Sequence, residues 1–198
     1  MIDHVGTKVS PFRTMGASSH SQTEREKDDF YATDPKAVKR LLEVEKFNNV
    51  IWENAVGMWH IADVLSEAGH EVIGTDLAVR DSRTYQLDFL ASPKRPIDES
   101  FDIVSNPPYK FATEWVDKSM EALEEGCKLA LLLKLTFLEG QKRAELFKKY
   151  PPKRVHVFSK RVHCAVGGNF ENTNSSAICY CWFIWEKGFQ GQPEIHWI

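Results

Sequence analysis

The chain has 198 residues, of which 42% are hydrophobic and 27% are charged, and its formal net charge is -3. This length and composition are typical of one globular domain with a sizeable core, and they leave too little chain for two full domains. The mean hydropathy is -0.38, and no apolar run comes near the roughly 18 residues of a membrane span, which excludes a membrane-spanning helix.

The N-terminal segment, residues 1–28, mixes small, polar and charged residues without the period of a helix or a strand. We predict a flexible arm there and a single domain over residues 29–198. The segment also lacks the apolar stretch of a secretory signal, which predicts a cytoplasmic protein without membrane contact. The four cysteines are too few for a disulfide framework and lack the spacing of a zinc site, so no metal is expected.

Strand and helix signals alternate along the rest of the sequence. Asp34 and Pro35 form an N-cap and first-turn pair that predicts a helix to about Lys46. The elements predicted after it are, in chain order, a strand at Val50–Trp52, a helix at His60–Ala68, a strand at Glu71–Thr75, a short extended segment at Tyr85–Leu90, a strand at Phe101–Val104, a helix at Thr113–Glu124, a strand at Lys128–Leu135, a helix at Gln141–Lys149, and strands at Arg154–Phe158 and Ser176–Glu186.

This alternation predicts an α/β fold of the doubly wound type, in which helices cover both faces of a mostly parallel sheet. The last two strands follow each other without a helix between them, which indicates an antiparallel C-terminal strand. Ligands bind such sheets beyond the carboxyl ends of the strands. Several predicted strands are followed by polar or glycine residues that would suit a turn individually but together predict a binding site: Glu53, Gly57, Asp76, Asp88 and Asn106.

The segment Asn106-Pro107-Pro108-Tyr109 carries the most specific chemistry. Its two prolines fix the backbone and lack N–H groups, while their carbonyl oxygens remain able to accept hydrogen bonds. The Asn106 side-chain oxygen and the Pro107 carbonyl could accept the two N–H groups of a planar amine and direct its lone pair at an electrophile. Tyr109 offers a flat face on which a heterocycle stacks. A plain Asn-Pro turn with a core tyrosine is the simpler alternative.

With this motif, the sequence resembles the S-adenosylmethionine-dependent amino-methyltransferases, and most closely the small DNA adenine-N6 methyltransferases of phages and prophages. The resemblance runs from about Ser18 to the C-terminus. It implies a Rossmann-like methyltransferase fold, S-adenosylmethionine as cofactor and DNA as partner. It also implies that residues 106–109 form the catalytic motif and hold a flipped adenine.

The same resemblance implies a set of cofactor-binding residues. Residues 29–35 are similar to a motif that lies over the methionine end of the cofactor, and Asp76 would bind the ribose hydroxyls. Asp88 would accept from the cofactor's adenine amino group, with Phe89 packed on its ring. The full set is Tyr31, Thr33 and Pro35 from the first motif, Glu53, Ala55 and Gly57 from the second, and Asp76, Asp88 and Phe89.

The chain departs from the family pattern at Trp59, where the second glycine of a cofactor motif normally lies. Its indole would either fill part of the pocket or turn into the core. We favour the pocket-facing orientation, which would weaken or reshape cofactor binding without abolishing it. The neighbouring His60 is either an ordinary helix-start residue or a polar group near the cofactor.

The C-terminal third is locally basic, with eight Lys or Arg residues against two Glu between Glu139 and His163. Such a run is either a solvated helix face with loop charges or a patch that contacts phosphates. On the second interpretation, Lys160 and Arg161 contact the nucleic-acid backbone. By the resemblance, Phe170 lies against the flipped base, opposite Tyr109.

The sequence therefore predicts an enzyme that transfers a methyl group from S-adenosylmethionine to the N6 amino group of adenine in DNA. Two alternatives remain: methylation of another planar amine, in an RNA base or a protein glutamine, and a catalytically silent nucleic-acid-binding protein in which Trp59 blocks the cofactor. A nicotinamide-dependent oxidoreductase is disfavoured because the chain lacks G-x-G-x-x-G.

Overall fold

The structure, a computed structural model, describes residues 31–91, 95–166 and 178–198. The predicted N-terminal arm and Phe170 lie outside these ranges, and the extent of the domain over residues 29–198 stays a prediction. Among the described residues, no helix is both long and apolar enough to cross a membrane. The same residues contain no group of three or more His, Cys, Asp or Glu side chains suited to a metal ion.

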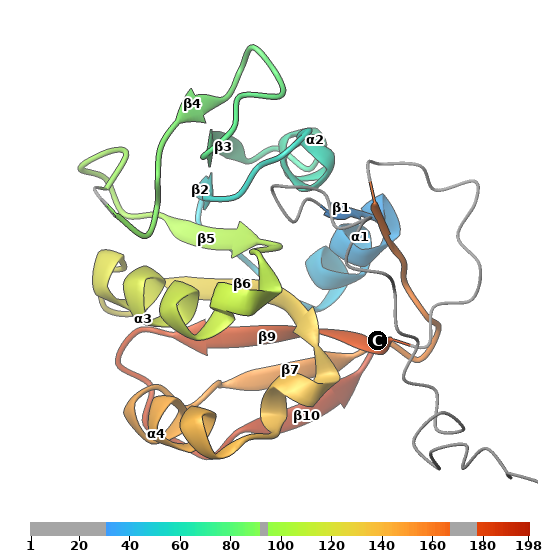
Figure 1. Cartoon of the computed structure of the whole chain (residues 1–198), viewed down its shortest axis with the longest axis vertical. Helices are drawn as coiled ribbons and strands as arrows, with labels where there is room; N and C mark the ends of the chain where they lie inside the picture. Colours follow the sequence, from blue (N-terminus) through green and yellow to red (C-terminus); the bar gives the residue numbers. More distant parts are fainter. Residues whose placement is uncertain (1–30, 92–94, 167–177) are drawn as a thin grey trace, which may run out of the picture.

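A central sheet of eight strands organises the described chain, in the order β10-β7-β9-β6-β5-β2-β3-β4 (Figure 1). Its strands are β2 (Val50–Glu53), β3 (Glu71–Asp76), β4 (Tyr85–Gln86), β5 (Asp102–Ser105), β6 (Lys128–Lys134), β7 (Arg154–Val157), β9 (Tyr180–Glu186) and β10 (Glu194–Trp197). All paired neighbours are parallel except β9, which is antiparallel to both β6 and β7. The predicted mostly parallel sheet with an antiparallel strand near the C-terminus is confirmed.

Helices cover both faces of this sheet, as predicted. One face packs against α1 (Pro35–Val44) and α2 (His60–Glu67), and the other packs against α3 (Ala112–Ala122) and α4 (Gln141–Lys149). Short 3-10 turns, η2 (Tyr109–Phe111) and η3 (Leu135–Leu138), follow β5 and β6. Asp34 caps α1 through a hydrogen bond from the Lys36 backbone N–H at 2.9 Å, with Pro35 in the first turn.

The side chains of β6 show why the central strands have nearly continuous apolar sequences. Leu129, Leu131 and Leu133 pack on the α3 and α4 side, whereas Ala130 and Leu132 pack on the α1 and α2 side. Successive strand side chains point to opposite faces, and both faces of this sheet are covered. The core therefore consists of two apolar layers that hold the carboxyl edge of the sheet in place.

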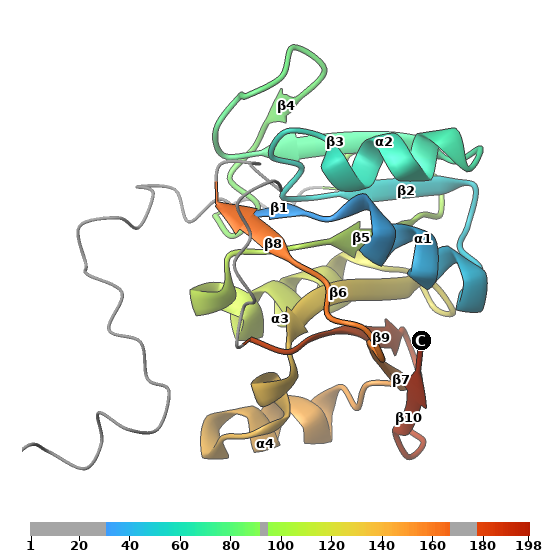
Figure 2. The ribbon, with the colours of Figure 1, turned by 90° about the vertical axis from the view of Figure 1, so that its right-hand side faces the viewer.

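Several element predictions need correction. The first helix ends at Val44 and not near Lys46, because Glu45 is already extended. The segment expected over Tyr85–Leu90 contains only the short β4, and the last predicted strand begins at Tyr180. Three short strands were not predicted: β10, and the pair β1 (Tyr31–Thr33) and β8 (Cys164–Val166), which form a separate antiparallel ribbon (Figure 2). These three short strands lack the continuous apolar sequence that identified the equally short β2 and β5.

Candidate active site

A cavity of about 610 Å³ opens at the carboxyl edge of the sheet. Nine of the predicted site residues line it: Tyr31, Thr33, Glu53, Ala55, Asp76, Asp88, Phe89, Asn106 and Pro108. Four other predicted residues, namely Pro35, Gly57, Pro107 and Tyr109, are not among the lining residues. The cavity therefore brings together predicted residues that lie up to 75 positions apart in the chain.

Glu53, the last residue of β2, places a buried carboxyl group at this cavity. Glu53 is only 1% exposed, and its Oε2 has no hydrogen-bond partner. Burial raises the pKa of Glu53 well above its ordinary value, and the nearby charge of Asp76 acts in the same direction. The backbone N–H of Ala62, in the first turn of α2, opposes this shift. A cationic ligand group would satisfy the open oxygen.

Asp76 ends the neighbouring strand β3, and its carboxylate is held by the turn that follows β2. Oδ2 accepts the Gly57 backbone N–H at 2.9 Å, and Oδ1 accepts the Ala78 backbone N–H at 2.9 Å. Gly57 has a φ of 55°, a left-handed conformation that glycine adopts without steric cost. Gly57 thus holds the Asp76 carboxylate through its backbone N–H, although Gly57 itself does not line the cavity. Arg80 also reaches Asp76, at 3.3 Å.

Asp88 and Phe89 close another side of the cavity. Asp88 is exposed, and its Oδ1 accepts the backbone N–H groups of Leu90 and Ala91 at 3.1 and 3.0 Å. Phe89 is buried, with its ring centroid 5.3 Å from that of Trp52 and 4.8 Å from that of Trp115. The phenyl ring is therefore fixed by the core, while the carboxylate beside it faces solvent.

Asn106, just after β5, presents a polar atom without a partner. Its Nδ2 donates to the Tyr31 carbonyl oxygen and to the Thr33 Oγ1, each at 3.0 Å. Its Oδ1 is buried and has no hydrogen-bond partner. A buried carbonyl oxygen left open at a cavity is an acceptor prepared for a donor of a ligand. An N–H group is a suitable guest.

Tyr109 lies beside this site and does not line the cavity. Its hydroxyl donates to the Cys164 Sγ at 3.5 Å, and its ring is flanked by Tyr31 and Tyr180 at centroid distances of 6.0 and 5.8 Å. Burial raises the pKa of Tyr109 well above its ordinary value. The Lys134 Nζ lies 5.1 Å from the centroid of the ring. The sequence did not indicate this aromatic cluster, because its three tyrosines come from three separate segments.

The hypothesis of a pocket-facing Trp59 is wrong. Its indole is only 6% exposed, is not among the lining residues, and packs with Val56 and Ala62. The indole N–H donates to the Thr84 Oγ1 at 2.9 Å, and a Cβ added at Gly74 would come within 2.7 Å of the Trp59 ring. The backbone at Trp59 keeps a φ of 66°, so the chain retains the left-handed turn of a glycine while the side chain points into the core.

Other lining residues were not recognised as a site from the sequence. Lys110 and Phe111 directly follow Tyr109 in the loop after β5, so extending the motif by two positions would have found them. Arg80 lies four residues after Asp76, but its contact with the Asp76 carboxylate depends on the conformation of the loop between them. His60 is both the first residue of α2 and a lining residue, and burial lowers its pKa. Its two interpretations are therefore compatible.

The basic region is only partly available for phosphates. Lys148, Lys149 and Lys153 pair with Glu145, Asp117 and Glu186 at 2.7, 2.6 and 2.7 Å. Arg154 is engaged by Glu45 at the opposite edge of the sheet, which favours a structural role for this residue. Lys160 and Arg161 are exposed in the loop between β7 and β8. The predicted phosphate contacts thus remain a hypothesis for these two residues.

The described fold is similar to that of solved methyltransferases. A chain described as a class I S-adenosylmethionine-dependent methyltransferase from Listeria monocytogenes is 14% identical, with a TM-score of 0.55 over 82% of this chain and 62% of that chain. For a predicted O-methyltransferase from Agrobacterium tumefaciens, the identity is 13%, the TM-score 0.57 and the coverage 83% and 85%. For a modification subunit described for a type I restriction enzyme from Vibrio vulnificus, the values are 13%, 0.56, 85% and 47%.

No family model and no curated protein matches the sequence. This chain spans less than two thirds of the Listeria and Vibrio chains. At these identities, the similarity shows the fold: a Rossmann-like methyltransferase fold, as the sequence predicted.

Proposed function

We propose that the protein transfers a methyl group from S-adenosylmethionine to the N6 amino group of adenine in DNA. The observation that carries this proposal is the Asn106 Oδ1, a buried acceptor without a partner, in a residue that lines the same cavity as the strand-tip residues Glu53 and Asp76. The methyltransferase fold supports the reaction type, and the resemblance of residues 106–109 to the adenine-N6 family supports the acceptor.

The residues of the cavity fit the proposed methyl donor. The open Oε2 of Glu53 suits the ammonium group of the methionine part, and Asp76 at the tip of β3 suits a ribose diol. The cavity volume of about 610 Å³ lies within the range of cofactor sites. When bound, S-adenosylmethionine supplies a methyl group activated by a sulfonium.

The chain's own contribution is to position the acceptor. The Asn106 Oδ1, from a residue that lines the cavity, accepts one N–H group of the amine. By the family resemblance the Pro107 carbonyl oxygen accepts the other, which directs the nitrogen lone pair toward the donor. Asn106 would hold the acceptor nitrogen while S-adenosylmethionine, held by Glu53 and Asp76, would supply the methyl group, and the proton that the nitrogen gives up would leave to solvent. Orientation of this kind supplies much of the barrier reduction in a direct transfer.

Several features support a nucleic acid as the acceptor. Lys110 lines the cavity and is exposed, and Lys160 and Arg161 are exposed in the loop that leads to β8. Positive side chains at the rim of a site favour a polyanion. The silent alternative depended on an indole that blocks the cofactor, and Trp59 lies outside the cavity. RNA and protein glutamine remain as outcomes of the test.

The test is methyl transfer from labelled S-adenosylmethionine to DNA, RNA and a protein extract in parallel, with analysis of the modified nucleosides. We expect N6-methyladenine in DNA. Asn106→Ala should lower the rate by roughly a hundredfold or more, because one preorganised hydrogen-bonding group is lost at the reacting nitrogen. Its cofactor affinity, measured by calorimetry, should stay within a few fold. Asn49→Ala, at an exposed asparagine of the opposite edge, is the matched control.

Each contrary result has a separate meaning. Label that enters RNA or protein but not DNA would overturn the proposed acceptor and keep the reaction type. A wild-type protein without measurable affinity for S-adenosylmethionine would overturn the proposal as a whole. Equal rates for wild type and Asn106→Ala would remove the assigned role of Asn106.

A further inference from the structure

We propose that the β1–β8 ribbon is a positioning device, in which Thr33 and its cross-strand partner Cys164 hold Asn106 and Tyr109 in the orientation that receives the acceptor. This inference rests on the proposed function, because it assigns a task to the ribbon in the same reaction. It makes Thr33 a positioning residue that acts through Asn106, whereas the family resemblance implies a contact with the cofactor.

The first step concerns the side-chain amide of Asn106, which can be turned in two ways. The Tyr31 carbonyl oxygen can only accept a hydrogen bond, so the atom 3.0 Å from it must be the Asn106 Nδ2. The opposite orientation would bring two carbonyl oxygens together. Backbone of β1 thus decides that Oδ1, and not Nδ2, faces away from the ribbon.

Thr33 holds the other N–H group of the Asn106 side-chain amide. Its Oγ1 accepts the second N–H of Asn106 at 3.0 Å, and the residue is only 2% exposed. With both N–H groups held, rotation about the last side-chain bond of Asn106 would break two hydrogen bonds at once. The open Oδ1 is therefore fixed before any ligand arrives, which is the preorganisation that a directed acceptor requires.

Cys164 performs the equivalent task on the other strand. It is the register partner of Thr33, and its Sγ accepts the hydroxyl hydrogen bond of Tyr109. Burial raises the pKa of Cys164 to about 11, so the sulfur stays a neutral thiol near pH 7. One cross-strand pair therefore reaches both ends of the segment 106–109.

The ribbon has enough support to act as a rigid unit. Its register pairs Tyr31 with Val166, Ala32 with Ala165 and Thr33 with Cys164. The backbone N–H of Asp34 also donates to the His163 carbonyl at 3.2 Å, which continues the pairing toward α1. The segment before α1 and the segment after β7 are thereby joined next to residues 106–109, which follow β5.

The test compares Thr33→Val, which keeps the shape and loses the acceptor, with Thr33→Ser, which keeps the hydroxyl. We expect Thr33→Val to lower kcat about tenfold, as for the loss of one hydrogen bond, with KM for DNA and cofactor affinity within about threefold. Thr33→Ser should restore most of the lost kcat. A fall in cofactor affinity with unchanged kcat would overturn the proposal, because Thr33 would then contact the donor.

A second readout does not depend on methyl transfer. The side-chain amide resonances of Asn106, identified by their absence in Asn106→Ala, should exchange faster with solvent in Thr33→Val than in wild type or Thr33→Ser. Unchanged exchange would overturn the ribbon's role even in an active enzyme. Faster exchange in a protein that methylates nothing would support the ribbon while the proposed function fails.

Cys164 has its own pair of variants. Cys164→Ala removes the acceptor of the Tyr109 hydroxyl and should raise KM for DNA several fold, with cofactor affinity unchanged, whereas Cys164→Ser should stay close to wild type. Cys179→Ala is the control, because Cys179 is an exposed cysteine. Equal KM values for Cys164→Ala and wild type would overturn this half of the proposal.

Discussion

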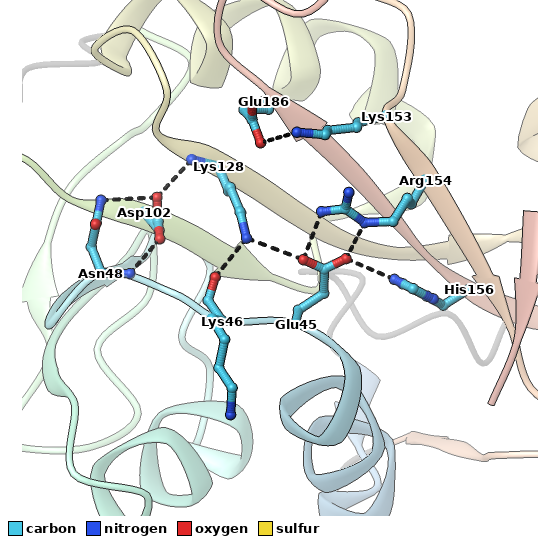
Figure 3. Close-up of polar contacts among 9 residues, drawn as sticks. All are labelled: Glu45, Lys46, Asn48, Asp102, Lys128, Lys153, Arg154, His156 and Glu186. Atoms are coloured by element: carbon cyan, nitrogen blue, oxygen red, sulfur yellow. Dashed lines mark hydrogen bonds and ion pairs between the residues drawn. The ribbon is translucent and has the colours of Figure 1, made fainter. Parts of the chain in front are cut away.

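Glu45, directly after α1, and Glu53, the last residue of β2, are buried carboxyl groups at opposite edges of the sheet, and their surroundings differ. Glu45 lies where β6 and β7 begin, and both of its oxygens are occupied (Figure 3). Oε1 binds Arg154 and the His156 Nε2, the latter at 2.9 Å. Oε2 binds Arg154 at 2.8 Å and the Lys128 Nζ at 3.2 Å.

Glu53 is buried to a similar extent, but it has almost none of the cationic and hydrogen-bonding partners that surround Glu45. Its Oε2 has no partner, and the charged groups that affect it most, Asp76 and Asp63, are negative. Burial raises the pKa of both carboxyl groups, but hydrogen bonds from His156 and Arg154 outweigh it at Glu45, whose pKa falls to about 2. At Glu53 burial dominates, and the pKa rises well above its ordinary value.

The difference separates a structural edge of the sheet from a functional one. At the amino edge, Asp102 is also fully engaged, by the backbone N–H groups of Asn48 and Lys128 at 2.6 Å each (Figure 3). At the carboxyl edge, Glu53 and Asn106 each leave a buried oxygen open. Open buried acceptors lower the stability of the unliganded protein, and at Glu53 and Asn106, which line the cavity, they indicate a ligand that satisfies them.

The largest expected effect comes from removing the charge at the amino edge. Glu45→Gln leaves the cations Arg154 and Lys128 without their carboxylate in a buried site, and we expect a loss of about 3 kcal/mol in the free energy of unfolding. Urea denaturation at pH 7 measures it. The control is Glu43→Gln, because Glu43 forms an exposed pair with Arg40 and should change stability by less than about 1 kcal/mol.

The pH dependence of the same variant sharpens the comparison. The folded pKa of Glu45, about 2, lies below the ordinary value of 4.5, so its contribution is fully present above pH 4.5 and is lost as the pH falls toward 2. Wild type should therefore lose more stability than Glu45→Gln between pH 5 and pH 3. Parallel pH profiles for the two proteins would contradict the assigned network.

The next largest expected change in stability concerns Trp59, in the turn between β2 and α2. Trp59→Gly removes a buried indole, at a cost of about 3 to 5 kcal/mol, and relieves a left-handed residue, worth about 1 to 2 kcal/mol. We expect a net loss of about 2 kcal/mol by urea denaturation. Cofactor affinity should stay within about threefold, because the indole does not line the cavity. If Trp59→Gly were more stable than wild type and bound the cofactor more tightly, the hypothesis of a pocket-facing indole would be supported again.

The parts of the fold that the sequence predicted are those governed by local patterns. The apolar run of β6, the proline and N-cap of α1 and the polar residues after β2, β3 and β5 were all readable along the chain. The strand-tip argument and the family resemblance together named the nine predicted residues that line one cavity. Their roles toward a ligand remain predictions.

The parts that were missed depend on contacts between distant segments. The ribbon pairs Thr33 with Cys164, and neither residue belongs to a periodic pattern. The direction of the Trp59 indole is decided by Gly74 of β3, whose missing side chain makes room for the ring. The network of Glu45 reaches Arg154, 109 positions away. Such partners are fixed by the packed sheet and leave no signal within a window of sequence.

The smallest expected effect acts on the open carboxyl group at the cavity. The pKa of Glu53 is raised, so the folded protein holds this proton more tightly than the unfolded chain does. The contribution of Glu53 to the free energy of unfolding is therefore greatest below pH 4.5 and decreases as the pH rises toward the folded pKa. This direction is opposite to that of Glu45. Glu53→Gln should remove the decrease and leave the unliganded protein more stable than wild type at high pH.

The same substitution tests what the open oxygen is for. A glutamine keeps one carbonyl acceptor but loses the charge, so its affinity for the ammonium group of S-adenosylmethionine should fall about tenfold, the difference between a charged and a neutral hydrogen bond. In wild type, binding requires Glu53 to ionise, so calorimetry in two buffers of different ionisation enthalpy should show proton release that Glu53→Gln lacks. Glu71→Gln, at an exposed glutamate that begins β3, should match wild type in both measurements. Equal proton release in wild type and Glu53→Gln would mean that both edges of the sheet use their buried carboxyl groups for structure alone.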